Sequence, residues 1–282
     1  MLKNSNLNIP NPIYFNNTEG KFLYIRHGKT FYNIEFEKLG SDKTIKTDPK
    51  FIDCELSPEG IKQAKDRQSI LNSFKIEDVY VSPLYRTLQT AYYLLETHPN
   101  KKNITIHVHP LISENVNATH DITFDIKKSK KKFNENSEIK YDWNIFDSYY
   151  KTERDQDLYY LNFIDLLDEK EKNNIINKIY KNYGTDNLKN CLSEMIGLEN
   201  KFNLYYLESY KHIFNRNYQF KEFLKEKYKN SLNNKDMKVV VISHGGYCKI
   251  GTSKKAYEVE KIDKLPDDCY FFKNCEIVSM NI

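Results

Sequence analysis

The sequence has few cysteines and no targeting segment. Its five cysteines, at positions 54, 191, 248, 269 and 275, form no CxxC pair and no metal-type spacing with a histidine. An odd number of scattered thiols suits a reducing compartment. The start, MLKNSNLNIPNPIYFNNTEG, lacks the basic and apolar regions of a signal peptide, and no apolar stretch is long enough to cross a bilayer. These absences predict a cytoplasmic protein without a metal site and without a membrane partner.

The sequence also lacks a strong excess of charge of either sign. It has 43 basic and 39 acidic residues among 282, a net charge of +4. This balance argues against nucleic acid as a partner, although it leaves an anionic substrate open. Hydrophobic residues make up 39% of the chain, and the 22 Tyr and 16 Phe among the aromatics can bury much apolar area. The length allows one large domain with a sizeable core.

Short apolar runs alternate with helical patterns. Strands are expected at 21–26, 79–82, 104–109 and 236–244, with strand-like segments in 270–280, and helices at 58–72 and 84–96. Ser57 suits the N-cap of the first helix, and Pro58 suits its first turn. The alternation predicts an α/β three-layer sandwich with a mostly parallel central sheet.

The stretch from about 115 to 235 differs from the rest because it is rich in Lys, Asn, Glu and Tyr. The apolar positions Leu204, Leu207, Tyr210, Ile213 and Phe214 indicate a helix, which we place within 202–229. The run KKSKKK at 127–132 is interpreted as a loop. The sequence therefore predicts a single domain over 1–282, with a largely helical insertion at about 115–235 that lies over the active edge of the sheet.

Polar residues follow several of the predicted strands. RHG at 26–28 and HG at 244–245 each end a strand, and Ser82 ends another, just before a helix that carries Arg86. In parallel α/β sheets, ligands bind beyond the carboxyl ends of the strands. We therefore expect these side chains at one site, although they are far apart in the sequence.

Five motifs extend this pattern: RHGKT at 26–30, LSPEG at 56–60, VSPLYRTLQTA at 81–91, LISE at 111–114 and VVVISHGG at 239–246. In this order they resemble the histidine phosphatase superfamily, which includes cofactor-dependent phosphoglycerate mutases. The resemblance covers most of the chain outside the insertion.

The resemblance implies roles that suit the chemistry of phosphoryl transfer, which depends on positioning and cationic stabilisation. His27 is the expected nucleophile, because a neutral imidazole is available near pH 7. Arg26 and Arg86 would hold phosphate oxygens with planar forks, His244 would add a donor as an imidazolium, and Glu114 would protonate the leaving group. The further substrate-binding candidates are Thr30, Asn33, Gly245 and His120. No metal or other cofactor is implied.

Several alternatives remain open, because the superfamily contains phosphatases, mutases and inactive binders. The residues after Glu114, NVNATHD, lack the Arg, Tyr and Gly of the mutases. We therefore expect a metal-independent phosphatase that acts on small phosphate monoesters through phosphohistidine. A cofactor-dependent mutase is the second hypothesis, and a non-catalytic phosphoryl-binding module is the third. His27 and His244 could instead pack in the core, and Arg86 and Glu114 could be surface residues.

Overall fold

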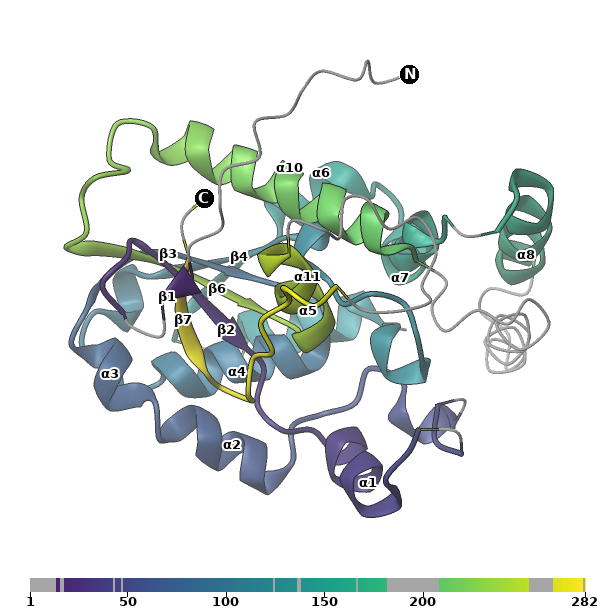
Figure 1. The fold of residues 1–282 in the computed structure, drawn as a ribbon, viewed down its shortest axis with the longest axis horizontal. Helices are drawn as coiled ribbons and strands as arrows, with labels where there is room; N and C mark the ends of the chain where they lie inside the picture. Colours follow the sequence, from purple (N-terminus) through teal and green to yellow (C-terminus); the bar gives the residue numbers. More distant parts are fainter. Residues whose placement is uncertain are drawn as a thin grey trace.

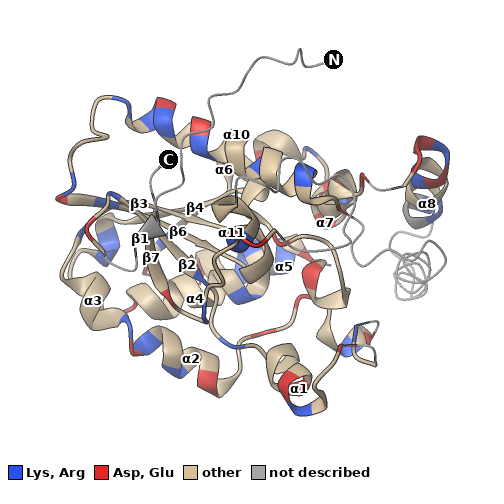
Figure 2. Cartoon of the chain, viewed as in Figure 1, with Lys and Arg blue, Asp and Glu red and all other residues tan. Residues whose placement is uncertain are grey.

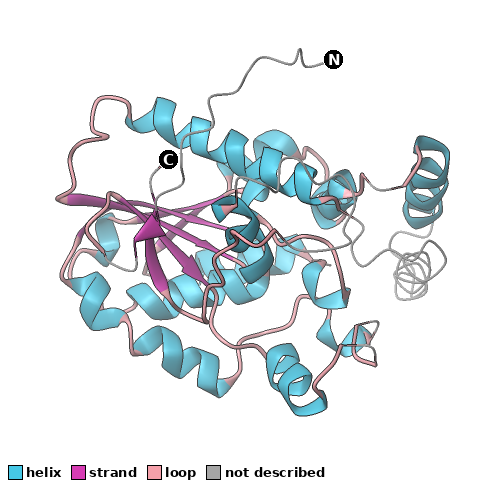
Figure 3. Ribbon diagram, in the orientation of Figure 1, coloured by secondary structure: helices cyan, strands magenta, loops and turns pink. Residues whose placement is uncertain are grey.

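The computed structural model describes most of the chain outside the N-terminus and two internal stretches. The described residues are 14–15, 18–42, 44–46, 48–123, 125–135, 138–165, 167–181, 208–253, 266–280 and 282. Figure 1 shows a central sheet with helices on both faces. Figure 3 shows that the strands form one continuous sheet.

The sheet has seven strands in the order β1-β7-β2-β6-β3-β4-β5. Its strands are β1 (Tyr14–Phe15), β2 (Phe22–Arg26), β3 (Lys75–Val81), β4 (Thr105–Val108), β5 (Lys140–Asp142), β6 (Met237–Ser243) and β7 (Ile277–Met280). The five strands from β2 to β5 in this order are parallel, whereas β7 is antiparallel to β2 and to β1. Arg26 pairs with Ser243, and Val81 pairs with Ile242. The carboxyl ends of the central strands therefore meet at one edge.

The strands alternate between two apolar layers, as the twofold period of a strand requires. Ile25, Val79 and Ile242 belong to a core that includes residues of the helices on one face. These helices are α2 (Pro58–Lys65), α3 (Gln68–Asn72), α4 (Tyr85–Leu95) and α5 (Ile126–Glu135). Tyr24 and Val241 belong to the core of the opposite face, which α10 (Tyr210–Tyr228) and α11 (Gly245–Thr252) cover. The prediction of a three-layer α/β sandwich with a mostly parallel sheet is confirmed.

The remaining elements connect these layers. They are α1 (Phe31–Leu39), η1 (Pro49–Phe51), η2 (Lys101–Asn103), η3 (Pro110–Ile112), η4 (Thr119–Asp121), α6 (Asn144–Tyr149), α7 (Glu153–Asp157), η5 (Tyr159–Phe163) and α8 (Glu169–Lys181). The described residues of the stretch expected as a helical insertion thus form six helical segments of three to thirteen residues before α10. The same stretch also supplies β5, which pairs with β4.

Several expected elements have different limits. The helix expected at 58–72 is two helices, and the turn between them directs Arg67 Nε to the carbonyl oxygen of Cys275, at 3.3 Å. In the segment expected to form strands at 270–280, only β7 is a strand, because Cys275 adopts a φ of 54° and makes a turn before it. The long helix begins at Tyr210, with Ser209 as its N-cap. Its predicted positions 204 and 207 lie outside the described residues.

The expectation of a loop at KKSKKK is wrong, because these residues form most of α5. Ile126, Ser129 and Phe133 are buried at helical spacing, and the lysines occupy the positions between them. Lys130 donates to Asp147 at 2.5 Å, so its charge is neutralised locally. The sequence did not reveal this helical spacing, because only Ile126 and Phe133 of the three buried residues are apolar.

Charges of both signs are mixed along α1, α8 and α10 (Figure 2). Among the described residues, no helix is both long enough and apolar enough to span a bilayer.

Candidate active site

His27 lies directly after β2 and is buried. Its backbone amide donates to the carbonyl oxygen of Ser243 at 2.9 Å, which continues the pairing of β2 with β6 beyond the strand end. Its own carbonyl oxygen accepts from Asn274 Nδ2 at 2.9 Å. The imidazole is therefore carried on backbone that is held from both sides.

The hydrogen bonds of the His27 ring define its tautomer. Nδ1 lies 2.7 Å from the carbonyl oxygen of Gly28, so Nδ1 carries the proton and donates. Arg86 Nε donates to His27 Nε2 at 3.2 Å, which requires a lone pair on Nε2. Burial, together with the positive charges of Arg86 and Arg26, lowers the pKa of His27 well below its usual value. His27 is thus a neutral imidazole whose Nε2 lone pair faces the guanidinium of Arg86.

Two glycines allow the RHGKT and LSPEG segments to lie against each other. A Cβ on Gly28 would be 2.6 Å from the carbonyl oxygen of Gly60, and a Cβ on Gly60 would be 2.0 Å from that of Lys29. Ser57 caps α2 by accepting from the Gly60 amide at 3.1 Å, and its hydroxyl donates to Lys29 O at 2.9 Å. LSPEG therefore supports the backbone of the loop that carries His27.

Arg86 lies in the first turn of α4 and is buried, with 1% of its surface exposed. Besides His27, its guanidinium donates through Nη1 to the carbonyl oxygen of His120 and through Nη2 to Asp121 Oδ1, at 3.1 Å for the latter. The helix start is anchored by Asp53, whose Oδ1 accepts from the Tyr85 amide at 2.8 Å. Arg86 therefore joins the strand-end loops after β2 and β4.

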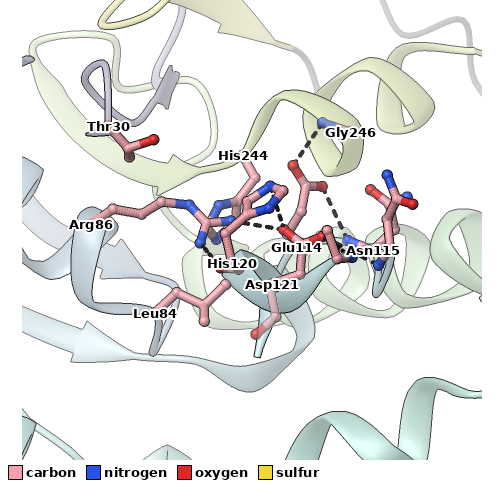
Figure 4. A network of polar contacts seen from close by, with 12 residues as sticks. Thr30, Leu84, Arg86, Glu114, Asn115, His120, Asp121, His244 and Gly246 are labelled. Carbon is pink, nitrogen blue, oxygen red and sulfur yellow. Dashed lines mark hydrogen bonds and ion pairs between the residues drawn. The ribbon is translucent and has the colours of Figure 1, made fainter. Parts of the chain in front are cut away.

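His120 and Asp121 form a pair beside Arg86 (Figure 4). His120 Nε2 lies 3.1 Å from Asp121 Oδ1, and the ring stacks on Tyr32 with a centroid distance of 3.6 Å. Asp121 Oδ2 accepts from two backbone amides, those of Asn117 and Ala118. Burial raises the pKa of Asp121, whereas the Arg86 guanidinium and both amides oppose the rise. Burial and the charge of Arg86 lower the pKa of His120.

Arg26 ends β2 and approaches Gly245 closely. Its Nη1 donates to the carbonyl oxygen of Phe272 at 2.9 Å. A Cβ on Gly245 would lie 3.0 Å from Arg26 Nε, so the absence of a side chain there leaves room for the guanidinium. Burial lowers the pKa of Arg26, and the charge of Glu114 partly compensates.

His244 lies after β6, and its ring centroid is 5.3 Å from that of His27. Its Nε2 is 2.8 Å from Ser82 Oγ. Burial, followed by the charge of Arg86, lowers the pKa of His244 well below its usual value. Burial beside cations thus favours the neutral ring over the imidazolium that the sequence suggested.

Glu114 follows η3 and binds the N-terminus of α11. Its Oε1 accepts from the Tyr247 amide at 2.8 Å, and its Oε2 accepts from the Gly246 amide at 3.1 Å. A Cβ on Gly246 would lie 2.5 Å from Glu114 Oε1 and 2.1 Å from Asn115 Oδ1. Glu114 is half-buried, and its charge acts to raise the pKa of the Arg26 guanidinium. Gly246 is therefore needed for the carboxylate to reach this place.

Thr30 and Asn33 form reciprocal hydrogen bonds at the start of α1. Thr30 Oγ1 accepts from the Asn33 amide, and Asn33 Oδ1 accepts from the Thr30 amide, both at 3.1 Å. This capping box fixes the direction of α1, which carries Tyr32 to the ring of His120. Direct contact of either residue with substrate remains a prediction.

Three buried nitrogen atoms in the site accept or donate no hydrogen bond among the described residues. They are Arg26 Nε, His120 Nδ1 and His244 Nδ1. Buried polar atoms in proteins are normally paired. A cluster that combines two arginines with unpaired nitrogens suits an anion with several oxygens, such as a phosphoryl group. Within the described ranges, no group of three or more His, Cys, Asp or Glu side chains is arranged to hold a metal ion.

The structure brings together all the candidates with expected catalytic roles, namely Arg26, His27, Arg86, Glu114 and His244, as well as Gly245 and His120. Sequence reasoning named Asp121 beside His120 as a possible substrate contact, but it missed the supporting residues Asp53, Asn115 and Gly246. Gly246 and Asn115 are adjacent to named candidates and could have been found. The role of Asp53 left no sign in the sequence, because its contact with the Tyr85 amide joins residues that are distant in the chain.

A cavity of about 900 Å³ adjoins the site without containing the catalytic candidates. Phe31, Ile34, Phe51 and Tyr85 contribute to its apolar wall, and Lys50, Lys128 and Lys132 contribute charge.

Comparisons with solved structures found distant similarities. An ecdysone phosphate phosphatase from Bombix mori, in complex with tungstate, has 13% identity and a TM-score of 0.44, over 91% of this chain and 87% of that chain. An alpha-ribazole phosphatase from Shigella flexneri has 13% identity and a TM-score of 0.40, over 90% of this chain and 95% of that chain. A phosphoserine phosphatase from Entamoeba histolytica, in complex with 3-phosphoglyceric acid, has 19% identity and a TM-score of 0.34, over 81% and 76%. Similarities this distant do not indicate what this chain acts on.

No curated protein matches this chain. The family model described as histidine phosphatase superfamily (branch 1) matches residues 22–145. This region contains four of the five motifs, and the fifth, at 239–246, lies beside them in space through the pairing of β2 and β3 with β6. The match confirms, over residues 22–145, the resemblance to the histidine phosphatase superfamily that the motifs indicated.

Proposed function

We propose that this protein is a phosphatase that hydrolyses small phosphate monoesters through a phosphohistidine at His27. The observation that carries the proposal is the ring of His27, which is neutral, protonated on Nδ1 and directs Nε2 at Arg86. A nucleophile needs this lone pair, and a phosphoryl group needs this cation. The cluster of unpaired nitrogens supplies further donors for the same group.

In the first step, the lone pair of His27 Nε2 attacks phosphorus while the bond to the leaving oxygen breaks. Arg86 and Arg26 neutralise the charge on the phosphoryl oxygens, and His244 Nδ1 donates a third hydrogen bond from the opposite side. The Ser82 hydroxyl holds Nε2 of His244, so that Nδ1 carries the proton. The entering phosphate takes the place of His27 Nε2 as an acceptor for Arg86.

Glu114 supplies the proton that the leaving oxygen takes. The amides of Gly246 and Tyr247 hold its two carboxylate oxygens in place. In the second step, water attacks phosphorus, the bond to Nε2 breaks, and the proton of water passes to Glu114. Inorganic phosphate then leaves, and no metal or cofactor takes part.

The test is a panel of phosphate esters assayed for phosphate release, together with rapid acid and alkali quenching. Wild-type protein should form an acid-labile, alkali-stable phosphoprotein, and His27→Ala should lose both turnover and labelling. His98→Ala is the matched control, because His98 is also buried but its ring contacts the Phe74 carbonyl oxygen and the Asn100 amide, away from the candidate site. Substantial turnover by His27→Ala would refute the nucleophile.

The same panel separates the phosphatase from the two other hypotheses. With 3-phosphoglycerate and 2,3-bisphosphoglycerate present, isomerisation faster than hydrolysis by roughly two orders of magnitude would identify a mutase, since a mutase must keep water from phosphohistidine. Binding of phosphate without turnover of any ester would identify a binding module.

A further inference from the structure

A buried ion pair connects α10 with the loop that carries Glu114. Arg216 is 3% exposed, and Glu208 is fully buried. Arg216 Nε and Nη2 donate to the two carboxylate oxygens of Glu208, at 2.6 and 2.9 Å. His212 Nδ1 lies 2.7 Å from Glu208 Oε1. Removing two charges from water is costly, so a pair in this position needs further contacts to be stable.

The third nitrogen of Arg216 provides those contacts at the catalytic loop. Nη1 donates to the carbonyl oxygen of Leu111 at 2.6 Å and to that of Ser113 at 3.2 Å. The carbonyl oxygen between them, on Ile112, accepts from Ser243 Oγ at 2.6 Å. All three carbonyl oxygens before Glu114 are therefore held by side chains of α10 and β6.

Glu208 and two aromatic rings fix the plane of the guanidinium. The carbon Cζ of Arg216 lies 4.2 Å from the ring centroid of Phe163 and 5.6 Å from that of Tyr247. Tyr247 is also the residue whose amide donates to Glu114. A lysine could offer one charge here, but it could not bond to the carboxylate and to two carbonyl oxygens in one plane.

We propose that the Arg216–Glu208 pair is the positioning device for Glu114: it sets the place of the leaving-group acid through the backbone of residues 111–113. The inference rests on the proposed function, in which Glu114 protonates the leaving oxygen. In this proposal α10 acts in catalysis without contacting substrate, because its Arg216 determines the position of the proton donor Glu114.

The test compares an alkyl phosphate with p-nitrophenyl phosphate, whose leaving group needs no proton. In Arg216→Met, kcat for the alkyl ester should fall by about tenfold to a hundredfold, since a misplacement of about 1 Å can cost that much. Phosphorylation of His27 by the aryl ester, measured by rapid quenching, should remain close to wild type. Arg216→Lys should show the same selective loss, because it keeps the charge and loses the planar fork.

Arg216→Met leaves Glu208 buried without its partner and can impair folding. The double variant Arg216→Met with Glu208→Gln removes both charges, and it should recover thermal stability without recovering activity on the alkyl ester. Leu224→Ala is the matched control, since Leu224 is a fully buried α10 residue in the core of this face. It should lower stability and leave the ratio of alkyl to aryl activity unchanged.

The outcomes separate this inference from the proposed function. A wild-type protein without activity on either ester, or a Glu114→Gln variant without selective loss, would refute the proposed function. If Glu114→Gln selectively slows phosphorylation of His27 by the alkyl ester, but Arg216→Met and the double variant slow phosphorylation by both esters equally, or by neither, the positioning role is overturned.

Discussion

Gly246→Ala should move Glu114 without unfolding the protein. The new Cβ would lie 2.1 Å from Asn115 Oδ1 and 2.5 Å from Glu114 Oε1, whereas ordinary contacts begin at 3.4 Å. The carboxylate must therefore shift by about 1 Å, and it loses the bonds to the Gly246 and Tyr247 amides, at 3.1 and 2.8 Å. Alanine is favoured over glycine in a helix by about 0.5–1 kcal/mol, which offsets part of the loss in stability.

The expected result is a loss of about a hundredfold in kcat on an alkyl phosphate, because a shift of this size disables a general acid. The rate at which p-nitrophenyl phosphate phosphorylates His27, measured by rapid quenching, should stay within about threefold, since nitrophenolate leaves without a proton. The free energy of unfolding, from urea titration, should change by less than about 1 kcal/mol.

The control is the same substitution in a Glu114→Gln background. If Gly246→Ala acts through Glu114, it should add little to the loss that Glu114→Gln alone causes, so the two effects are strongly non-additive. Equal losses in the rate of His27 phosphorylation by both esters, or full additivity, would show that Gly246 acts on something other than the proton donor.

Three further predictions concern protonation and capping. Because burial and Arg86 lower the pKa of His27, the rate of phosphoenzyme formation, corrected for substrate ionisation, should not decline between about pH 7.5 and 6; a decline centred on the ordinary histidine pKa would contradict this. Burial alone would raise the pKa of Asp78, but bonds from His107, Tyr228 and Lys227 lower it to about 2, from 3.8. The Asp78 carboxylate therefore stabilises the fold above about pH 4, and this stabilisation is lost as pH falls towards 2. Asp78→Asn should lower the free energy of unfolding by about 1–2 kcal/mol at pH 6 and by much less at pH 2. An equal loss in urea titrations at both pH values would contradict this prediction. Ser57→Ala should lower the free energy of unfolding by about 1–2 kcal/mol, because its hydroxyl both caps α2 and holds Lys29 O; a loss no larger than that of Thr152→Ala, a cap on the surface helix α7, would contradict it.

Much of the sheet was predictable from local pattern. The Val/Ile run at 239–242 and the polar residues after it predicted both β6 and the site at its carboxyl end, because a parallel sheet brings strand ends together. The pairing partners were not predictable in the same way. The edge strand β5 has only three residues, and its place beside β4 depends on contacts between segments more than thirty residues apart.

The site was predictable as far as its motifs extend. The protonation of His244 was not, because it depends on burial and on the cations around it, and neither can be read from the residue itself. The links from Arg216 to Leu111 and Ser113 were also hidden, since they join segments about a hundred residues apart. Long-range hydrogen bonds of this kind leave no periodic trace in a sequence.

The position of β6 between β2 and β3 has a consequence for how the chain folds. Val239 pairs with Phe22 of β2 on one side and with Asp78 of β3 on the other. The strands β2 and β3 therefore join one sheet only after β6, near the end of the chain, pairs with both. Contacts of such long sequence separation form slowly, since a large loop must close first. During synthesis, the strands of the first hundred residues therefore wait with unpaired edges, which are prone to aggregation. The proposed phosphatase activity should return only with the slowest phase of refolding. Recovery of activity would therefore measure the insertion of β6 between β2 and β3.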